Sequence, residues 1–303
     1  MKGIVLAAGS GTRLYPITEG ISKQLMPIYD KPMIFYPISV LMLAGIKDIL
    51  IITTEQDQPY FWRLLKDGSN FGVNFEYKIQ KHPNGLAEAF LIGEDFISDD
   101  ECAMILGDNI FYGNDFTKML ARAKKNAEKG YATNFGFKVH DPERFGIMEF
   151  DDKGNILSVE EKPEHPKSDF AITGLYFYPK GVVEKAKTIK PSARGELEIT
   201  DLNNLYLQEN KLKAELLGGG FSWFDTGTFN SYMEAGQMIK SLEQNQGRVI
   251  ACLEQIAFDK NWITPATLEA RAKLTRKNSY GEFLDKILNN YKSHFGAVEK
   301  SKK

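Results

Sequence analysis

The chain has 303 residues, 43% hydrophobic and 26% charged, so it can bury a sizeable core as one large domain or a domain with an appendage. Its 38 basic and 40 acidic side chains nearly balance, which argues against a nucleic-acid partner. Two cysteines and the lack of a membrane-spanning apolar run favour a cytoplasmic protein with no disulfide framework and no membrane partner.

The chain begins with an apolar run, residues 3–7, which is typical of a strand buried on both faces. The next helical pattern starts only near Pro32, and such a long connection is usually functional or disordered. The Gly-Ser-Gly turn at residues 9–11 leaves backbone N–H groups free to converge on an anion, and Arg13 and Lys23 can reach the same anion. This stretch favours a polyphosphate ligand. A turn of this composition is, however, also common after a strand in proteins where it binds nothing.

Two common glycine motifs do not fit this loop. A P-loop requires Lys directly after its last glycine, and Thr12 stands there. A dinucleotide fingerprint requires a third glycine where Leu14 stands, and Pro16 follows too soon for a helix to begin. The loop therefore disfavours a P-loop site and a nicotinamide-dependent dehydrogenase.

Strand-like runs alternate with helical patterns through the first half of the chain. We expect helices over residues 33–44, 58–66 and 86–96, and strands over residues 48–53, 73–79 and 102–106. Gly45 is placed to end the first of these helices. The alternation predicts an α/β fold with a doubly wound, largely parallel, Rossmann-like sheet, whose ligands bind beyond the carboxyl ends of the strands.

Polar residues follow the predicted strand at residues 102–106. Asp108 is well placed there to hold a divalent metal against phosphate oxygens, but short polar residues also often cap turns. Gln80 presents a similar choice. Its amide can pair with the edge of a pyrimidine, or it can lie on an exposed surface.

The second half of the chain has a different sequence pattern, with short strands in place of alternating strands and helices. Short strands are expected over residues 133–139, 146–150, 156–160 and 170–178, separated by turn residues. They predict an antiparallel extension that carries a second substrate. The charged segment at residues 159–163 belongs either to that site or to an exposed strand end.

The last part of the chain is mostly helical. A helix is expected to end near Glu209, and another to run to about Leu242 after Asp225. Thr226 or Thr228 could serve only as the cap of that second helix. We expect a core of residues 1–240 and a helical segment of residues 241–303 that packs on the core or on a partner subunit.

Several of these segments together resemble one family. The stretches Leu-Ala-Ala-Gly-Ser-Gly-Thr-Arg-Leu-Tyr-Pro at 6–16 and Ser-Lys-Gln-Leu-Met-Pro at 22–27 resemble the signature of sugar nucleotidyltransferases. Residues 106–113 resemble that family's metal-binding segment, and residues 223–228 resemble the segment with its second metal-binding Asp. The resemblance covers nearly the whole chain. It implies an enzyme that joins a nucleoside triphosphate to a sugar 1-phosphate and releases pyrophosphate.

The resemblance also implies the substrates. Residues 29–33, 41–45 and 190–201 are typical of short, feedback-regulated members that use dTTP and glucose 1-phosphate to make dTDP-glucose, the first step toward dTDP-L-rhamnose and other deoxysugars. The same chemistry with UTP or another sugar phosphate stays open, because thymine and uracil differ by one methyl group. A catalytically silent regulatory subunit on the same fold is disfavoured, since no expected metal Asp or loop Arg is missing.

The family's site residues carry over onto matching positions. The catalytic set is Arg13, Lys23, Asp108, Lys162 and Asp225, with Mg²⁺ held by Asp108 and Asp225. The nucleotide-binding set is Leu6, Ala8, Gly9, Ser10, Gly11, Thr12, Arg13, Gln24, Gln80, Pro83, Gly85, Gly107 and Asp108. The sugar-phosphate-binding set is Asn109, Gly146, Glu161, Lys162, Ile172, Tyr176 and Trp223.

A second, regulatory nucleotide site is the last implication of the resemblance. The family's enzymes are homotetramers that bind the pathway end product between subunits. The matching residues here are Tyr112, Gly113, Arg248, Cys252 and Glu254. These residues could equally only pack a subunit interface.

Overall fold

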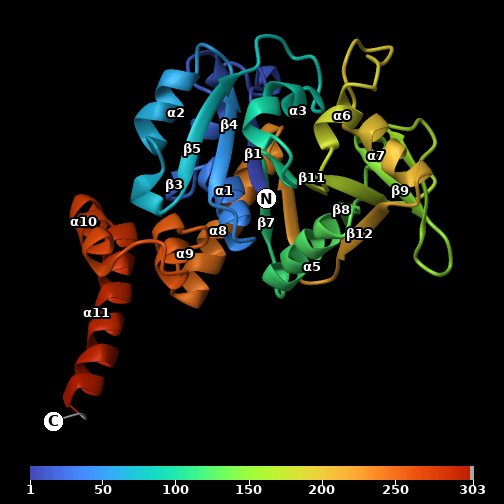
Figure 1. Cartoon of the computed structure of the whole chain (residues 1–303). Helices are drawn as coiled ribbons and strands as arrows, with labels where there is room; N and C mark the ends of the chain where they lie inside the picture. The colour runs from blue at the N-terminus through green and yellow to red at the C-terminus, as the bar shows by residue number, and fades with distance from the viewer. Residues whose placement is uncertain (301–303) are drawn as a thin grey trace.

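A computed structural model describes the backbone of residues 1–300 and the side chains of residues 1–293. Figure 1 shows a central sheet with helices on both faces and a group of C-terminal helices to one side. The strands are β1 Lys2–Ala7, β2 Pro27–Ile28, β3 Lys31–Pro32, β4 Asp48–Thr53, β5 Asn74–Ile79, β6 Cys102–Leu106, β7 Asn109–Tyr112, β8 Ala132–Lys138, β9 Gly146–Phe150, β10 Ile156–Glu161, β11 Phe170–Tyr178, β12 Leu212–Leu217 and β13 Ser222–Asp225. The helices are α1 Phe35–Leu43, α2 Gln58–Leu65, α3 Glu88–Ile92, α4 Glu94–Ile97, α5 Phe116–Glu128, α6 Val182–Ala186, α7 Ile199–Gln208, α8 Phe229–Gln246, α9 Leu253–Asp259, α10 Pro265–Thr275 and α11 Ser279–Lys300.

Nine strands form one sheet. Its order is β10-β9-β11-β6-β1-β4-β5, with β8 paired to β11 and β12 paired to β8. The part from β6 to β5 is wholly parallel, and β11 begins the antiparallel part that also contains β9 and β10. The predicted fold class, a doubly wound sheet with an antiparallel extension, is confirmed.

Side chains on the parallel strands alternate between two apolar cores, because successive residues of a strand point to opposite faces. On β1, Val5 and Ala7 face a core covered by α1, α2 and α5, whereas Ile4 and Leu6 face a core covered by α3, α4, α6 and α7. Helices on both faces keep these strands from water. This explains why β1, β4 and β6 consist of nearly continuous apolar residues.

One predicted element is wrong in its length. Residues 86–96 were expected to form a single helix, but α3 and α4 are separate helices that meet at Gly93. A Cβ atom at this position would lie 3.0 Å from the Ala89 carbonyl oxygen and 3.2 Å from a methyl group of Leu50. Gly93 thus allows the two short helices to pack closely on the sheet.

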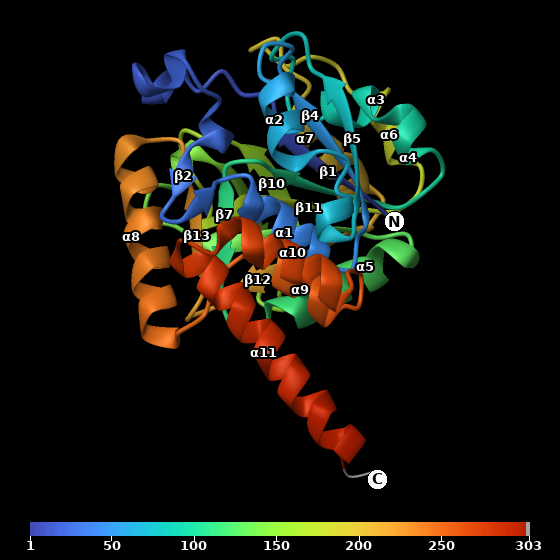
Figure 2. The ribbon, with the colours of Figure 1, turned by 90° about the vertical axis from the view of Figure 1, so that its left-hand side faces the viewer.

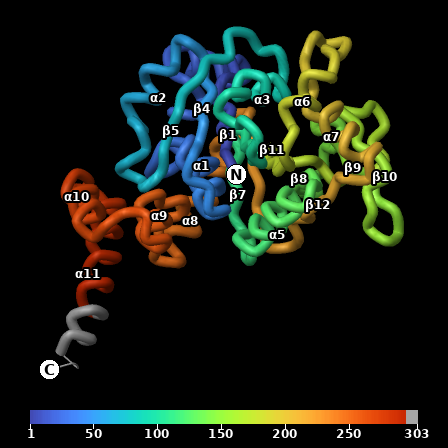
Figure 3. Tube along the Cα trace, in the orientation of Figure 1, coloured from blue at the N-terminus to red at the C-terminus, as the bar shows by residue number. Residues whose placement is uncertain are grey.

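The C-terminal helices pack on the core. Figure 3 shows α9 beside α1, far from it in sequence, and Leu253, Ala257 and Leu268 are buried in the same core as α1. In Figures 1 and 2, α11 runs away from the body of the molecule. The expected boundary at residues 240 and 241 falls inside α8, which ends at Gln246, and residues 301–303 lie outside the described residues. No helix in the described part is long and apolar enough to cross a membrane.

Glu254, at the start of α9, is fully buried and links three helices. Its Oε1 accepts hydrogen bonds from Arg271 on α10, at 3.0 Å from Nε and 2.8 Å from Nη2. Its Oε2 accepts a 2.5 Å hydrogen bond from the hydroxyl of Tyr280 on α11. The Arg271 guanidinium also lies 5.1 Å from the centre of the Phe71 ring, which ties the helical segment to the core.

Replacing Arg271 tests this link. Arg271→Ala would leave a buried carboxylate with no cation, which typically destabilises a protein by about 3–5 kcal/mol. Urea unfolding of the purified protein measures the change. Lys273→Ala, on the same helix but paired with the exposed Glu269, is the matched control and should change stability little. Equal, small effects of the two substitutions would contradict the assignment.

Candidate active site

The strand order reverses beside β1. β4 lies on one side of β1 and β6 on the other, and the Gly107 N–H donates a 2.8 Å hydrogen bond to the Leu6 carbonyl at their carboxyl ends. In open α/β sheets, ligands bind in the crevice outside the strand ends at such a switch point. The glycine-rich loop follows β1, and Asp108 follows β6. Both segments therefore lie where this fold binds ligands.

The glycine-rich loop forms the floor of a first groove. Gly11 has φ 65°, a left-handed conformation that glycine adopts most easily, and its carbonyl accepts a 2.7 Å hydrogen bond from the Thr18 hydroxyl. A Cβ atom at Gly9 would meet no atom within 4 Å, so the backbone there is open to a ligand. Every member of the expected nucleotide-binding set except Gly107 lines this groove, as does Lys23. Gly107 lies directly behind it, where a Cβ would be 3.0 Å from the Gln24 side chain.

A second groove continues from the first over the antiparallel part of the sheet. All seven members of the expected sugar-phosphate set line it, together with Asp225. Arg13 and Asp108 line both grooves, so the two grooves meet at these residues. A ligand in one groove can thus touch a ligand in the other beside Arg13 and Asp108.

The two carboxylates come together through a small separate sheet. β13 pairs antiparallel with β7, and the register sets Asp225 opposite Asn109, the residue after Asp108. The N–H and the hydroxyl of Thr226 both donate to the Asp108 carbonyl, at 3.2 and 2.9 Å. This pairing was not predicted from the sequence. It brings two aspartates from distant parts of the chain to one place.

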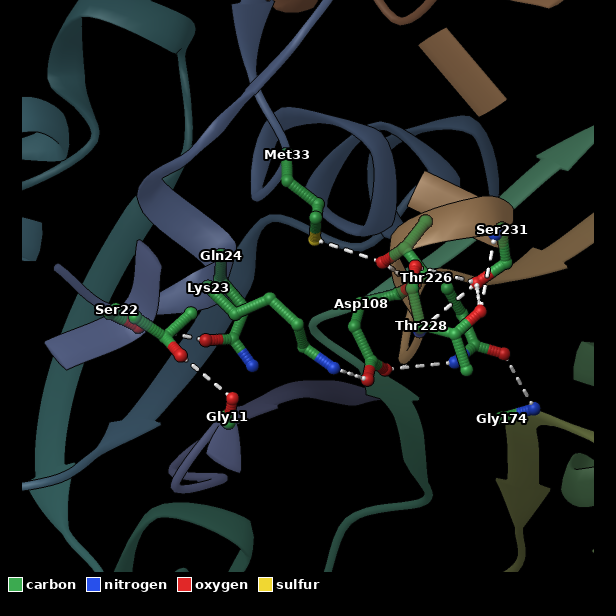
Figure 4. A network of polar contacts seen from close by, with 12 residues as sticks. Gly11, Ser22, Lys23, Gln24, Met33, Asp108, Gly174, Thr226, Thr228 and Ser231 are labelled. Carbon is green, nitrogen blue, oxygen red and sulfur yellow. Dashed lines mark hydrogen bonds and ion pairs between the residues drawn. The ribbon is translucent and has the colours of Figure 1, made fainter. Parts of the chain in front are cut away.

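The negative charge of the Asp108 carboxylate is stabilised by a lysine and by hydrogen bonds. In Figure 4 the Lys23 ammonium points at the Asp108 carboxylate, where it pairs with Oδ2. The Asn109 amide donates to Oδ1 at 3.0 Å. Burial acts to raise the pKa of Asp108, but the Lys23 charge and these hydrogen bonds outweigh it, so this pKa lies below its ordinary value. Asp108 is therefore an anion held by a buried lysine.

The pKa of Asp225 is shifted in the opposite direction to that of Asp108. Burial, and after it the charge of Asp108, raise the pKa of Asp225 above its ordinary value, and nearby cations offset this only in part. Two carboxylates placed this close need additional positive charge to be ionised together.

The residues present fit a Mg²⁺ ion. Mg²⁺ prefers oxygen ligands and is usually held by one or two carboxylates together with substrate phosphates and water. Asp108 and Asp225 supply two carboxylates at the meeting point of the grooves. In the described part of the chain there is no cluster of three or more His, Cys, Asp or Glu side chains that could hold a metal by itself. A site that completes its coordination with substrate oxygens matches both facts.

The grooves also contain residues that were not named from the sequence, among them Gly227, Arg144 and Arg194. A Cβ atom at Gly227 would lie 2.8 Å from Nη2 of Arg13 and 3.0 Å from Oδ1 of Asp225, so glycine lets this guanidinium lie across the loop after β13. Arg144 and Arg194 both line the second groove. Arg144 lies in no sequence pattern that distinguishes it from an ordinary surface cation. Arg194 and Gly227 lie in the stretches of residues 190–201 and 223–228 that resemble the family, and this resemblance was the available signal for them.

Comparisons with known proteins identify the class. A family model described as nucleotidyl transferase matches residues 2–241, and the chain belongs to this family. Among curated relatives, a glucose-1-phosphate thymidylyltransferase of Neisseria gonorrhoeae is 57% identical over 284 residues, covering 94% of this chain and 98% of the relative. The enzyme of that name from Mycobacterium tuberculosis strain H37Rv is 49% identical over 288 residues, covering 95% of this chain and 99% of the relative.

Solved structures agree in fold. A crystal structure from Bacillus anthracis assigned to the same kind of enzyme, in complex with a sucrose, has a TM-score of 0.72 and 41% identity, covering 78% of this chain and 94% of that one. A UDP-glucose pyrophosphorylase complexed with UDP-glucose has a TM-score of 0.69 and 27% identity, covering 79% of this chain and 98% of that one. The fold is thus shared with solved structures that carry these two enzyme names.

Removing either carboxylate tests the centre of the site. Asp108→Asn or Asp225→Asn should lower turnover about a hundred- to a thousand-fold, the usual cost of losing one group that stabilises developing charge. Steady-state pyrophosphate release at saturating Mg²⁺ measures this loss, and circular dichroism checks the fold. Asp152→Asn, an exposed aspartate outside both grooves, is the control. Near-normal turnover of Asp108→Asn would remove Asp108 from the site.

Proposed function

We propose that the protein transfers the thymidylyl group of dTTP to glucose 1-phosphate and releases pyrophosphate. The observation that carries this proposal is the meeting of two polar grooves at Arg13 and Asp108, beside Asp225. The curated relatives that share 46–57% of their residues with this chain carry the name of this activity. The product would be dTDP-glucose, the starting compound for dTDP-L-rhamnose and related deoxysugars.

The reaction needs no general base. A phosphate oxygen of glucose 1-phosphate, already anionic at neutral pH, attacks the α-phosphorus of dTTP. The new P–O bond forms while the bond from the α-phosphorus to the bridging oxygen breaks, and pyrophosphate leaves with that electron pair. Among the described residues that line the two grooves there is no histidine, which agrees with this chemistry. Positioning and charge stabilisation then provide the catalysis.

Cationic side chains occupy the places where the phosphates would lie. Arg13 lies at the junction, where charge develops on the departing pyrophosphate. Lys23 pairs with Asp108 in the free protein and is within the first groove, so it can also bind the triphosphate. Lys162 lines the second groove and is assigned to the sugar phosphate. Mg²⁺ bound by Asp108 and Asp225 would neutralise charge on the α-phosphate.

Each groove also contains a polar side chain suited to recognise its ligand. Gln80 is buried, and its amide nitrogen donates to the Gly85 carbonyl at 3.2 Å and to Glu88 at 2.8 Å. This fixed amide is the proposed contact for the pyrimidine. Glu161 in the second groove accepts hydrogen bonds from Thr200 at 2.6 Å and from Arg194 at 3.3 Å. Its anchored carboxylate is the proposed acceptor for a sugar hydroxyl.

The choice of nucleotide is tested by pyrophosphate release from dTTP, UTP, CTP and ATP with glucose 1-phosphate. We expect the highest kcat/KM with dTTP, and a value for UTP that is lower by roughly 10- to 200-fold, because one methyl group is worth about 1–3 kcal/mol in a pocket. A second candidate, the same transfer from UTP, is favoured by the likeness to UDP-glucose pyrophosphorylase. Equal or greater kcat/KM with UTP would establish that candidate. No release with any nucleotide would indicate a catalytically silent subunit.

We also infer a homotetramer with a second, regulatory nucleotide site. The hydroxyl of Tyr112, at the end of β7, accepts a hydrogen bond from Gln246, which brings β7 close to the exposed Arg248. Cys252 and Glu254 are buried, so the surface available to a ligand is made by Tyr112, Gly113 and Arg248. An aromatic ring and a guanidinium suit a nucleoside diphosphate.

Arg248→Ala tests the regulatory site. We expect dTDP-rhamnose to inhibit the unmodified protein at saturating substrates and the substitution to weaken that inhibition by about five- to 150-fold, the usual range of allosteric coupling. Uninhibited turnover should stay the same. Inhibition that is purely competitive with dTTP and unaffected by Arg248→Ala would mean that no second site operates.

A further inference from the structure

The side-chain amide of Gln80, directly after β5, has its nitrogen held by the protein. Gln80 is 7% exposed and lines the first groove. Its Nε2 carries two protons and donates to two acceptors, the Gly85 carbonyl at 3.2 Å and Oε2 of Glu88 at 2.8 Å. Because a carbonyl and a carboxylate oxygen accept and do not donate, these two neighbours determine which end of the amide faces them.

The oxygen of the same amide is left for a ligand. Among the described residues, no hydrogen bond involves Oε1 of Gln80, and this atom is not one of the buried polar atoms that lack a partner. It therefore keeps contact with open space, and the open space that Gln80 lines is the first groove. A ligand in this groove meets a hydrogen-bond acceptor at Gln80 and not a donor.

Glu88, in the first turn of α3, connects Gln80 to the loop that follows it. Its Oε2 accepts the hydrogen bond from Gln80, and its Oε1 accepts a 2.8 Å hydrogen bond from Nδ2 of Asn84. The other side of the loop is fixed by Gly85, which has φ 106° and where a Cβ atom would lie 2.4 Å from the Leu197 carbonyl oxygen. Glu88 does not itself line the first groove, so it acts on a ligand there through Gln80.

An amide held in this way distinguishes bases by the group at N3. N3 of thymine and of uracil carries a proton and donates, whereas N3 of cytosine only accepts. The Gln80 oxygen can pair with the first kind of base and not with the second. If the amide turned over, its nitrogen would suit cytosine, but its oxygen would then face the Glu88 carboxylate and the Gly85 carbonyl with no proton between them.

We propose that Glu88 is a positioning residue that holds the Gln80 amide with its oxygen toward the base, and that it thereby makes the first groove select a base with a proton on N3 over cytosine. This inference rests on the proposed function only in placing a pyrimidine nucleotide in the first groove. It applies equally to a thymine and to a uracil nucleotide, because both carry the N3 proton.

Glu88→Met provides the test, with Glu149→Met as the matched control, because Glu149 accepts a similar 2.7 Å hydrogen bond from Ser158 outside both grooves. Calorimetric titration with dTTP, dUTP or dCTP and Mg²⁺, without glucose 1-phosphate, measures binding in the absence of turnover. We expect the unmodified protein to bind dTTP and dUTP more tightly than dCTP. Glu88→Met should lower the ratio of dTTP affinity to dCTP affinity by roughly 10- to 150-fold, the equivalent of one hydrogen bond to a charged group. Glu88→Gln, which keeps one side-chain oxygen, should retain more of this ratio, and Glu149→Met should leave it unchanged.

Three outcomes of that titration would overturn the proposal and leave the proposed function standing. Equal weakening of dTTP and dCTP binding in Glu88→Met would give Glu88 a structural role only. Unchanged affinities in Glu88→Met would give it no role at the base. Equal affinity of the unmodified protein for dTTP and dCTP would mean that the amide is not held in one orientation. Binding of none of the nucleotides by the unmodified protein would contradict the proposed function itself, and this proposal with it.

A measurement on the unmodified side chain covers the case in which Glu88→Met does not fold. The two side-chain N–H signals of Gln80 can be assigned in ¹⁵N-labelled protein by their absence from Gln80→Glu. We expect slow solvent exchange of both protons in the free protein, because each has an acceptor within the protein. Rapid exchange of either proton would show that Glu88 and Gly85 do not hold the amide in one orientation, which contradicts the proposal.

Discussion

The site depends on two carboxylates, those of Asp108 and Asp225, that lie near each other and are largely buried. Asp108 and Asp225 disfavour each other's charge, and burial increases the cost. The buried ammonium of Lys23 pairs with Asp108 in the free protein, but burial and the charge of Asp108 still hold the pKa of Asp225 above its ordinary value. A divalent cation would relieve both aspartates at once. It would also free Lys23 to bind an anion, so metal and triphosphate are expected to enter the site together.

The geometry of this pair comes from backbone pairing and not from the aspartates themselves. The topological switch beside β1 places the glycine-rich loop next to Asp108, and the register of β7 with β13 brings Asp225 to the same place. Glycines permit the closest approaches. At Gly174 and Gly227, a side chain would collide with Asn109 and Arg13, respectively. Glycines at these two positions therefore let the neighbouring side chains of the site come close to the backbone.

Much of the fold could be predicted because buried parallel strands require apolar residues. The bounds of β4, β6, β9 and β11 agree with the predicted runs, since each run is apolar and is bounded by turn residues. The helix expected over residues 86–96 was wrong, because a glycine inside a helical pattern is compatible with either one helix or two. The small β7–β13 sheet was missed, since its strands are short and mix polar with aromatic residues.

The arrangement of the site could be predicted from the sequence less well than the fold could. Many of the residues that line each groove could be named from motifs, but the spacing of motifs does not show which side chains meet. Asn109 illustrates the difference. Next to Asp108 in a known motif, it was expected to bind the sugar phosphate, and the groups that hold its side-chain oxygen, Gly174 and Trp223, come from strands far along the chain. Only the folded arrangement shows which neighbours orient its amide.

The central claim is that Asp108 and Asp225 together bind the cation that joins the two substrates. The most direct test is a crystal structure of the protein with dTTP and Mn²⁺, in which anomalous scattering locates the metal. The account predicts one peak within coordination distance of oxygen atoms from both aspartates and of the triphosphate, with Lys23 moved from Asp108 to a phosphate. A metal bound to the triphosphate alone, with Lys23 still paired to Asp108, would contradict it.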